Sequence, residues 1–150
     1  MNIQITDTSI RKATRLDFAY IRKLPVQLTC PSAESLLLKQ LRLMMQASDY
    51  ELAVLEQEMR IAAFIALQYV PARDSAMRFL VIKYLALDRF ALARGSAAEM
   101  EEHATRAAAT AGCPAILVRG AALSGVALKF YKDRCYVPEG GALIKRISKN

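Results

Sequence analysis

Cysteine and histidine are scarce in this sequence of 150 residues, and their scarcity limits the chemistry open to it. The three cysteines, Cys30, Cys113 and Cys135, form an odd number without a C-x-x-C pair, which argues against a disulfide framework and a zinc site. The single histidine, His103, falls in an expected helix with no second metal ligand at suitable spacing. We expect reduced thiols, no bound metal, and a solvated His103 paired with Glu99, four positions earlier.

Long apolar runs are also missing, although 54% of the residues are apolar. Charged residues interrupt each run before it reaches the roughly 20 residues that a membrane-spanning helix needs. The segment Met1–Arg15 is polar and mixed, unlike a secretory signal. We therefore expect a cytoplasmic protein without a membrane partner. Its length is that of one domain with a substantial core, so residues 1–150 are expected to form a single domain.

The stretch from Met77 to Gly112 is the most informative part of the chain. Met77–Asp88 is a continuous apolar run rich in strand-forming residues, which predicts a central strand. Small residues follow at Gly95–Ala97, and a helical pattern then ends at Gly112. The apolar positions of that pattern recur at helical spacing: Met100, Ala104, Ala107, Ala108 and Ala111. The pattern predicts a strand, a turn of small residues and a helix.

The start of this helix is a candidate anion site. The first N–H groups of a helix are unpaired within it, and the positive end of the helix dipole lies behind them. Gly95, Ser96 and Ala97 lack bulk, so a phosphate could approach the main chain, and Arg94 adds a positive charge. The alternative is structural, with Ser96 as an N-cap and Gly95 only permitting the turn.

Two segments resemble motifs of the GNAT N-acetyltransferase superfamily. Leu92-Ala93-Arg94-Gly95-Ser96-Ala97 resembles its pyrophosphate loop, Q/R-x-x-G-x-G/A, with Gly95 and Ala97 matching and Leu92 in the place of Gln or Arg. Further along the chain, Ala127–Tyr136 resembles the A-x-x-F-Y-x-x-x-G-F signature, with Cys135 in the place of glycine. The two resemblances occur in the order that the family has.

The resemblance implies an α/β protein with the GNAT acyl-CoA N-acyltransferase fold, a mixed and mostly antiparallel central sheet with helices on both faces. It implies acetyl-CoA as acyl donor and Tyr131 as the acid that protonates the departing thiolate; the alternative for Tyr131 is a core aromatic residue. Many relatives carry a glutamate on the central strand where this chain has Lys83 and Tyr84, so the general base is unassigned. The donor-binding residues that it implies are Ala86, Leu87, Leu92, Ala93, Arg94, Gly95, Ser96, Ala97 and Ala127.

The remaining pattern supplies the other elements of such a fold. We expect helices over Asp17–Leu24, after the capping sequence Thr29–Ser32, and over Val126–Lys132. We expect strands over Ser9–Thr14, Tyr50–Leu55, Arg60–Val70, Pro114–Val118, Tyr136–Val137 and Ala142–Ile147. The turn between Leu55 and Arg60 lacks the usual Gly or Asn, so its type is open. By resemblance, the region between the first two helices would border the acceptor pocket.

Three functions remain open on the sequence. The first is acetyl-CoA-dependent transfer to a primary amine of a small molecule or peptide; the alternative is a catalytically impaired GNAT-fold module that binds acyl-CoA or regulates. A third, nucleic-acid-associated function rests on the net charge of +7 alone, since no block of basic residues and no nucleic-acid-binding motif is present. The sequence does not identify the acceptor amine, and a homodimer is suggested only by analogy with the family.

Overall fold

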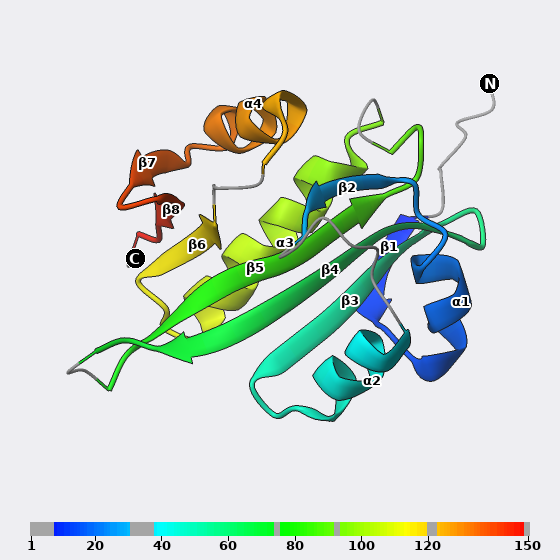
Figure 1. Cartoon of the computed structure of the whole chain (residues 1–150), viewed down its shortest axis with the longest axis horizontal. Helices are drawn as coiled ribbons and strands as arrows, with labels where there is room; N and C mark the ends of the chain where they lie inside the picture. Colours follow the sequence, from blue (N-terminus) through cyan, green and yellow to red (C-terminus); the bar gives the residue numbers. More distant parts are fainter. Residues whose placement is uncertain (1–7, 31–37, 74–75, 92–93, 120–122, 149–150) are drawn as a thin grey trace, which may run out of the picture.

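The computed structural model describes residues 8–30, 38–73, 76–91, 94–119 and 123–148. Within these residues eight strands form one sheet in the order β1-β3-β4-β5-β6-β8-β7, with β2 paired to β5 outside this path (Figure 1). The β5–β6 pair is parallel and the other pairs are antiparallel. This architecture confirms the predicted mixed, mostly antiparallel sheet. In chain order the elements are β1 (Thr8–Lys12), the 3-10 helix η1 (Arg15–Asp17), α1 (Phe18–Ile21), β2 (Val26–Thr29), α2 (Leu38–Gln46), β3 (Tyr50–Gln57), β4 (Arg60–Pro71), β5 (Arg78–Leu87), α3 (Ser96–Thr110), β6 (Ala115–Arg119), α4 (Gly125–Asp133), β7 (Val137–Glu139) and β8 (Ala142–Arg146).

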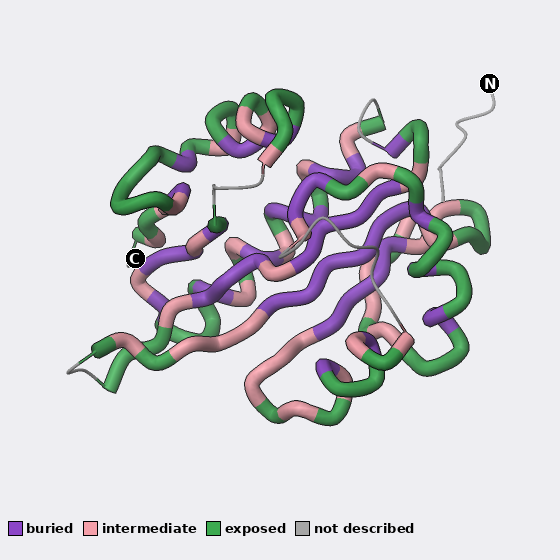
Figure 2. The backbone as a smooth tube through the Cα atoms, in the orientation of Figure 1, coloured by how far each residue is buried: buried purple, intermediate pink, exposed green. Residues whose placement is uncertain are grey.

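Both faces of the sheet are covered, because the central strands are apolar on both sides. On one face, residues of α1 and α2 such as Phe18 and Leu41 pack against Phe64 and Tyr84. On the other face, α3 and α4 cover the remaining core, which includes Leu85. Burial is concentrated in β3, β4 and β5, as Figure 2 shows. No helix in the described part of the chain is both long and apolar enough to cross a membrane.

The turn between β3 and β4 has a type that the sequence left open. Glu58 and Met59, the two residues between the strands, have positive φ angles of 51° and 64°. Positive φ at both central residues is the type I′ geometry, whose twist matches that of paired strands. The hairpin therefore forms with residues that are unusual for this turn.

The first helical region is shorter than predicted, and a strand comes after it. The helix expected over Asp17–Leu24 is divided into η1 and a short α1 that ends at Ile21. Pro25 then leads into β2, a strand of 4 residues that we did not expect. Its pairing partner is β5, about sixty positions away in the sequence, so local propensity carries little information about it.

Cys135, which stands at the glycine of the second motif, has a φ of 74°. Non-glycine residues pay about 1 kcal/mol in this left-handed region. We therefore expect Cys135→Gly to raise the free energy of unfolding by about 0.5–1 kcal/mol, less than the full strain because glycine also gains entropy in the unfolded chain. Urea unfolding measures this change. The control is Cys135→Ala, which removes the thiol but keeps the strain; an equal gain in both variants would contradict the explanation.

Candidate functional site

The centre of the candidate site is the edge of β5 from which β6 diverges. Between β4 and β5 the register shifts, because Ala66 pairs with Tyr84 and Leu67 with Ile82, which leaves Lys83 as an extra residue in β5. Such a bulge bends and twists its strand. Pairing of β5 with β6 is confined to Leu80 and Val81, just before the bulge. The carboxyl-terminal half of β5 is therefore not covered by β6.

The direction of the backbone groups on β5 can be deduced from one hydrogen bond. The Asp88 N–H donates to the Ala62 carbonyl at 2.8 Å, on the side of β4. Backbone groups alternate between the two edges of a strand, so those of Ala86 also face β4, whereas those of Leu85 and Leu87 face the opposite edge. Of the two main-chain positions predicted to contact the donor, the structure thus places Leu87, rather than Ala86, on the edge that β6 leaves.

This edge is occupied by β2. Val26 pairs with Leu87, Gln27 with Ala86, and Thr29 with Leu85, in an antiparallel arrangement. Figure 1 shows β2 beside the carboxyl-terminal half of β5, between β5 and α4. A segment of the chain itself therefore covers the main-chain edge that the resemblance assigns to the acyl donor.

Tyr131 is held against β2 from the other side. Ser124 caps α4 by accepting a hydrogen bond from the N–H of Ala127 at 3.2 Å, and Tyr131 follows one turn later, fully buried. Its hydroxyl is hydrogen-bonded to the Thr29 hydroxyl on β2. Burial raises the pKa of Tyr131 well above its ordinary value, although the bond with Thr29 acts in the opposite direction. The phenol is protonated at neutral pH, as a proton donor must be.

The start of α3 has open space at Gly95, which an anion needs to approach the main chain. Gly95 is the N-cap of α3 with a φ of 80°, and beyond its two chain neighbours no described atom lies within 4 Å of the place where its Cβ would be. Arg94 is exposed, and its guanidinium lies 5.8 Å from the centre of the Phe90 ring. The predicted donor-binding residues Leu92 and Ala93 lie outside the described residues.

The alternative interpretation of Ser96 as an N-cap is wrong, since Gly95 takes that position. Ser96 is the first residue of α3 and is buried, and its N–H donates to the Ala91 carbonyl at 2.9 Å. The same helix start buries Ala97. The first turn of α3 still presents its other N–H groups toward the loop.

Comparison with solved structures matches this architecture. The ribosomal-protein-S18-alanine N-acetyltransferase from Escherichia coli superimposes with a TM-score of 0.71 and 19% identity over 96% of each chain. Ard1 from Thermoplasma volcanium gives a TM-score of 0.76 at 11% identity, covering 95% of this chain and 99% of its own. An acetyltransferase of the GNAT family from Streptococcus pneumoniae gives 0.65 at 14% identity, covering 95% and 100%.

The chain has the GNAT acetyltransferase fold. This confirms the resemblance that the two sequence motifs suggested. No protein-family model and no curated protein matches the chain by sequence. The chain thus shares its fold with these acetyltransferases but little of their sequence, so the fold alone does not assign roles to the residues of the site.

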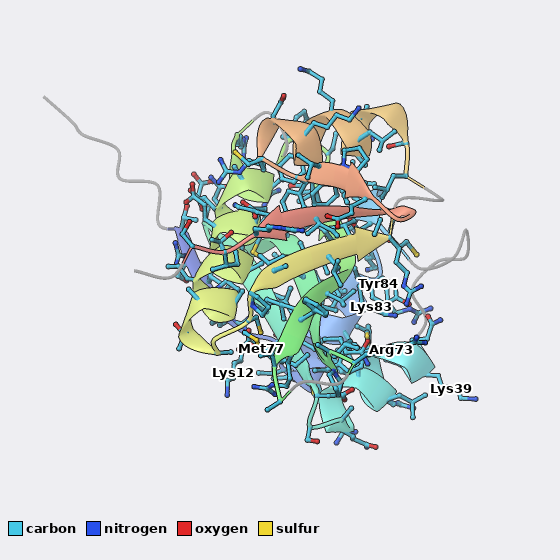
Figure 3. The ribbon with its side chains drawn as sticks, turned by 90° about the vertical axis from the view of Figure 1, so that its left-hand side faces the viewer. Lys12, Lys39, Arg73, Met77, Lys83 and Tyr84 are labelled. Atoms are coloured by element: carbon cyan, nitrogen blue, oxygen red, sulfur yellow. The ribbon has the colours of Figure 1, made fainter. Side chains whose placement is uncertain are left out.

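Lys83 occupies the bulge of this GNAT fold. Figure 3 shows Lys83 and Tyr84 on the side of the sheet that carries α2, whose Lys39 points away from the sheet. Lys83 is half-buried, and this burial, together with the charge of Arg119 at the end of β6, lowers its pKa. Among the described carboxylates none forms an ion pair with Lys83. The bulge therefore carries a lysine in the part of β5 where the resemblance implies a glutamate.

Glu101, which the sequence reasoning missed, ties α3 to the end of α4 and to β8. Its carboxylate is fully buried and accepts hydrogen bonds from Lys145 at 3.0 Å, Arg134 at 3.1 Å, and the Tyr136 hydroxyl at 2.9 Å. Since Tyr131 and Tyr136 are also in edge-to-face contact, with ring centres 5.1 Å apart, this cluster fixes the position of Tyr131. The feature of the sequence that could have revealed Glu101 is its charge within the otherwise apolar face of α3.

His103 does not pair with Glu99, contrary to our prediction. Its Nε2 lies 3.8 Å from Glu51 Oε2, and neither atom has a hydrogen-bond partner among the described residues. Burial lowers the pKa of His103 despite the nearby Glu51 carboxylate. The described residues hold no group of three potential metal ligands.

A cavity of about 730 Å³ lies elsewhere, beside α1 and the β3–β4 turn. Tyr20, Met59 and Asp88 are among its lining residues, and none of its described lining comes from α4 or β6. It is separate from Tyr131. This cavity is therefore not at the donor position implied by the resemblance, where β2 lies beside β5.

Proposed function

We propose that this protein binds acetyl-CoA and transfers its acetyl group to a primary amine of a small molecule or peptide. The observation that carries the proposal is the convergence of three features at one end of β5. These are the edge of β5 that β6 leaves and β2 occupies, the phenol of Tyr131 on α4, and the open space at Gly95 before α3.

The residues fit the phosphate end of acetyl-CoA. A diphosphate needs close approach to main-chain N–H groups, and the open space at Gly95 and the positive end of α3 provide for it. Arg94 is exposed beside this loop, and the net charge of +7 favours an anionic ligand at longer range. The rest of acetyl-CoA could lie along the edge of β5 only if β2 left that edge.

The acyl donor supplies a thioester whose carbon accepts the amine while the carbon–sulfur bond breaks. The Leu87 main chain faces the edge where the carbonyl would lie, and a main-chain N–H there would polarise it. Tyr131 would give its proton to the departing thiolate. The amine must reach the site neutral, and its proton leaves to a base or to water.

We expect Tyr131→Phe to lower kcat for acetylation by about 10²-fold, the range of general acid catalysis. The matched control is Thr29→Val, which loses the same hydrogen bond but keeps the phenol. Release of coenzyme A thiol, followed with a thiol reagent, measures both variants. Equal losses in the two variants would mean that Tyr131 serves only to hold β2.

A second candidate function is an acyl-CoA-binding or regulatory module without transferase activity. Two observations favour it: Lys83 replaces the expected carboxylate at the bulge, and β2 covers the donor edge. The two functions separate in one assay, because a module would bind acetyl-CoA without releasing thiol in the presence of any amine. Thiol release dependent on an added amine would exclude the module.

A further inference from the structure

β2 and the proposed acyl donor would occupy the same edge of β5 and would use the same main-chain groups. Leu85 and Leu87 turn their backbone groups toward β2, so Val26 and Thr29 take the same groups that an amide-containing pantetheine arm would need. A strand edge has room for one such partner at a time. Resting on the function proposed above, we infer that β2 is a built-in competitor of the acyl donor, which occupies the edge of β5 only after Val26–Thr29 has left it.

The attachment of β2 suits a segment that is displaced. It is short, at 4 residues, and a register shift between Gln27 and Thr29 interrupts its pairing. In the part of the chain that the structure describes, its only strand partner is β5. Gln27 is exposed, so one face of β2 contributes nothing to the core. Segments with few ladder bonds and exposed side chains open at low cost.

Two contacts oppose release and give the closed state its structure. Leu28 is buried in the core between the sheet and the α3/α4 layer. Thr29 is buried and hydrogen-bonded to Tyr131, the residue proposed as the acid. The Tyr131 hydroxyl would thus bind Thr29 in the closed state and face the donor sulfur in the open state. Release of β2 would therefore also free this hydroxyl to donate its proton.

A reversible covalent lock tests the inference. Gln27 and Ala86 are directly paired, and the alternation above makes them a non-hydrogen-bonded pair, in which Cα atoms are about 4.5 Å apart and a disulfide fits. The variant is Gln27→Cys with Ala86→Cys, made with Cys30→Ser to prevent exchange. Its oxidised form holds β2 on β5, and its reduced form is the matched control with the same sequence.

Two ligands are titrated by calorimetry into the wild type and both forms of the variant. Coenzyme A carries the pantetheine arm, and adenosine 3′,5′-bisphosphate lacks it. We expect oxidation to weaken coenzyme A binding at least tenfold, with recovery on reduction, and to leave bisphosphate binding unchanged. Equal coenzyme A affinity in the oxidised and reduced forms would overturn the inference and leave the proposed function standing. No coenzyme A binding by the wild type would overturn both.

Amide hydrogen exchange of the wild type provides a second readout that needs no substitution. With saturating coenzyme A, the amides of Val26 and Thr29 should exchange faster, because they lose β5, while those of Leu85 and Leu87 stay protected by the ligand. Faster exchange in β2 together with retained protection in β5 supports displacement. Increased protection of both strands would show that the ligand binds without moving β2, and would overturn the inference even if the locked variant failed to fold.

Discussion

The Gly95→Glu variant will lose coenzyme A binding. The substitution places a side chain and a negative charge in the open space before α3, where the pyrophosphate is proposed to lie. A ligand at about 100 times its Kd stabilises a folded protein by about 2.7 kcal/mol. We expect thermal unfolding to show this stabilisation by coenzyme A in the wild type and none in the variant.

The matched control for this variant lies at the other end of the same helix. Gly112 has a φ of 73°, close to the 80° of Gly95, and its Cβ position is equally open. Gly112→Glu therefore imposes the same backbone strain and the same charge change, away from the proposed phosphate position. It should keep the full stabilisation by coenzyme A. If both variants lost it, strain or net charge would be the cause, and the loop would not be the phosphate site.

Glu101→Gln will lower the free energy of unfolding by about 3 kcal/mol, because it removes the buried charge that Lys145 and Arg134 face. Glu102→Gln is the matched control: it also contacts Arg134, at 3.1 Å, but is 53% exposed. The control should cost less than about 1 kcal/mol. Chemical denaturation of both variants measures the difference, and similar costs would contradict the central position of Glu101.

The same carboxylate makes stability depend on pH in a defined direction. Burial alone would raise the pKa of Glu101, but hydrogen bonds from Lys145 and Tyr136 outweigh it, so the pKa in the folded state is lowered. A carboxylate whose pKa is lower in the folded state stabilises the fold at pH values above its unfolded-state pKa of about 4.3. This stabilisation is lost as the pH falls through the folded-state pKa. The wild type should therefore lose stability below about pH 4 more steeply than Glu101→Gln. Parallel pH profiles would contradict this assignment.

The elements that the sequence predicted well are those with long, unbroken patterns. The apolar run at Met77–Asp88 became β5 (Arg78–Leu87), and the helical spacing up to Gly112 became α3 (Ser96–Thr110). Each depends on local preferences that extend over ten or more residues. The GNAT fold was predicted from two short motifs, one at the start of α3 and one that spans most of α4.

The parts that the sequence did not predict depend on contacts between distant residues. β2 has an alternating pattern, Val26-Gln27-Leu28-Thr29, but the pattern is too short to separate it from a loop. It pairs with the part of β5 that follows the bulge at Lys83, and local sequence reveals neither the bulge nor the pairing. The bond between Thr29 and Tyr131 spans 102 positions, and only the fold brings the two together.

An acyl-CoA is proposed to bind between the edge of β5 and the start of α3. Titration calorimetry of the wild-type protein with acetyl-CoA tests this most directly, since it requires no knowledge of the acceptor amine. We predict one molecule bound per chain with a Kd in the micromolar range, about −8 kcal/mol. A well-folded wild type that shows no heat of acetyl-CoA binding and is not stabilised by the ligand would contradict the proposal.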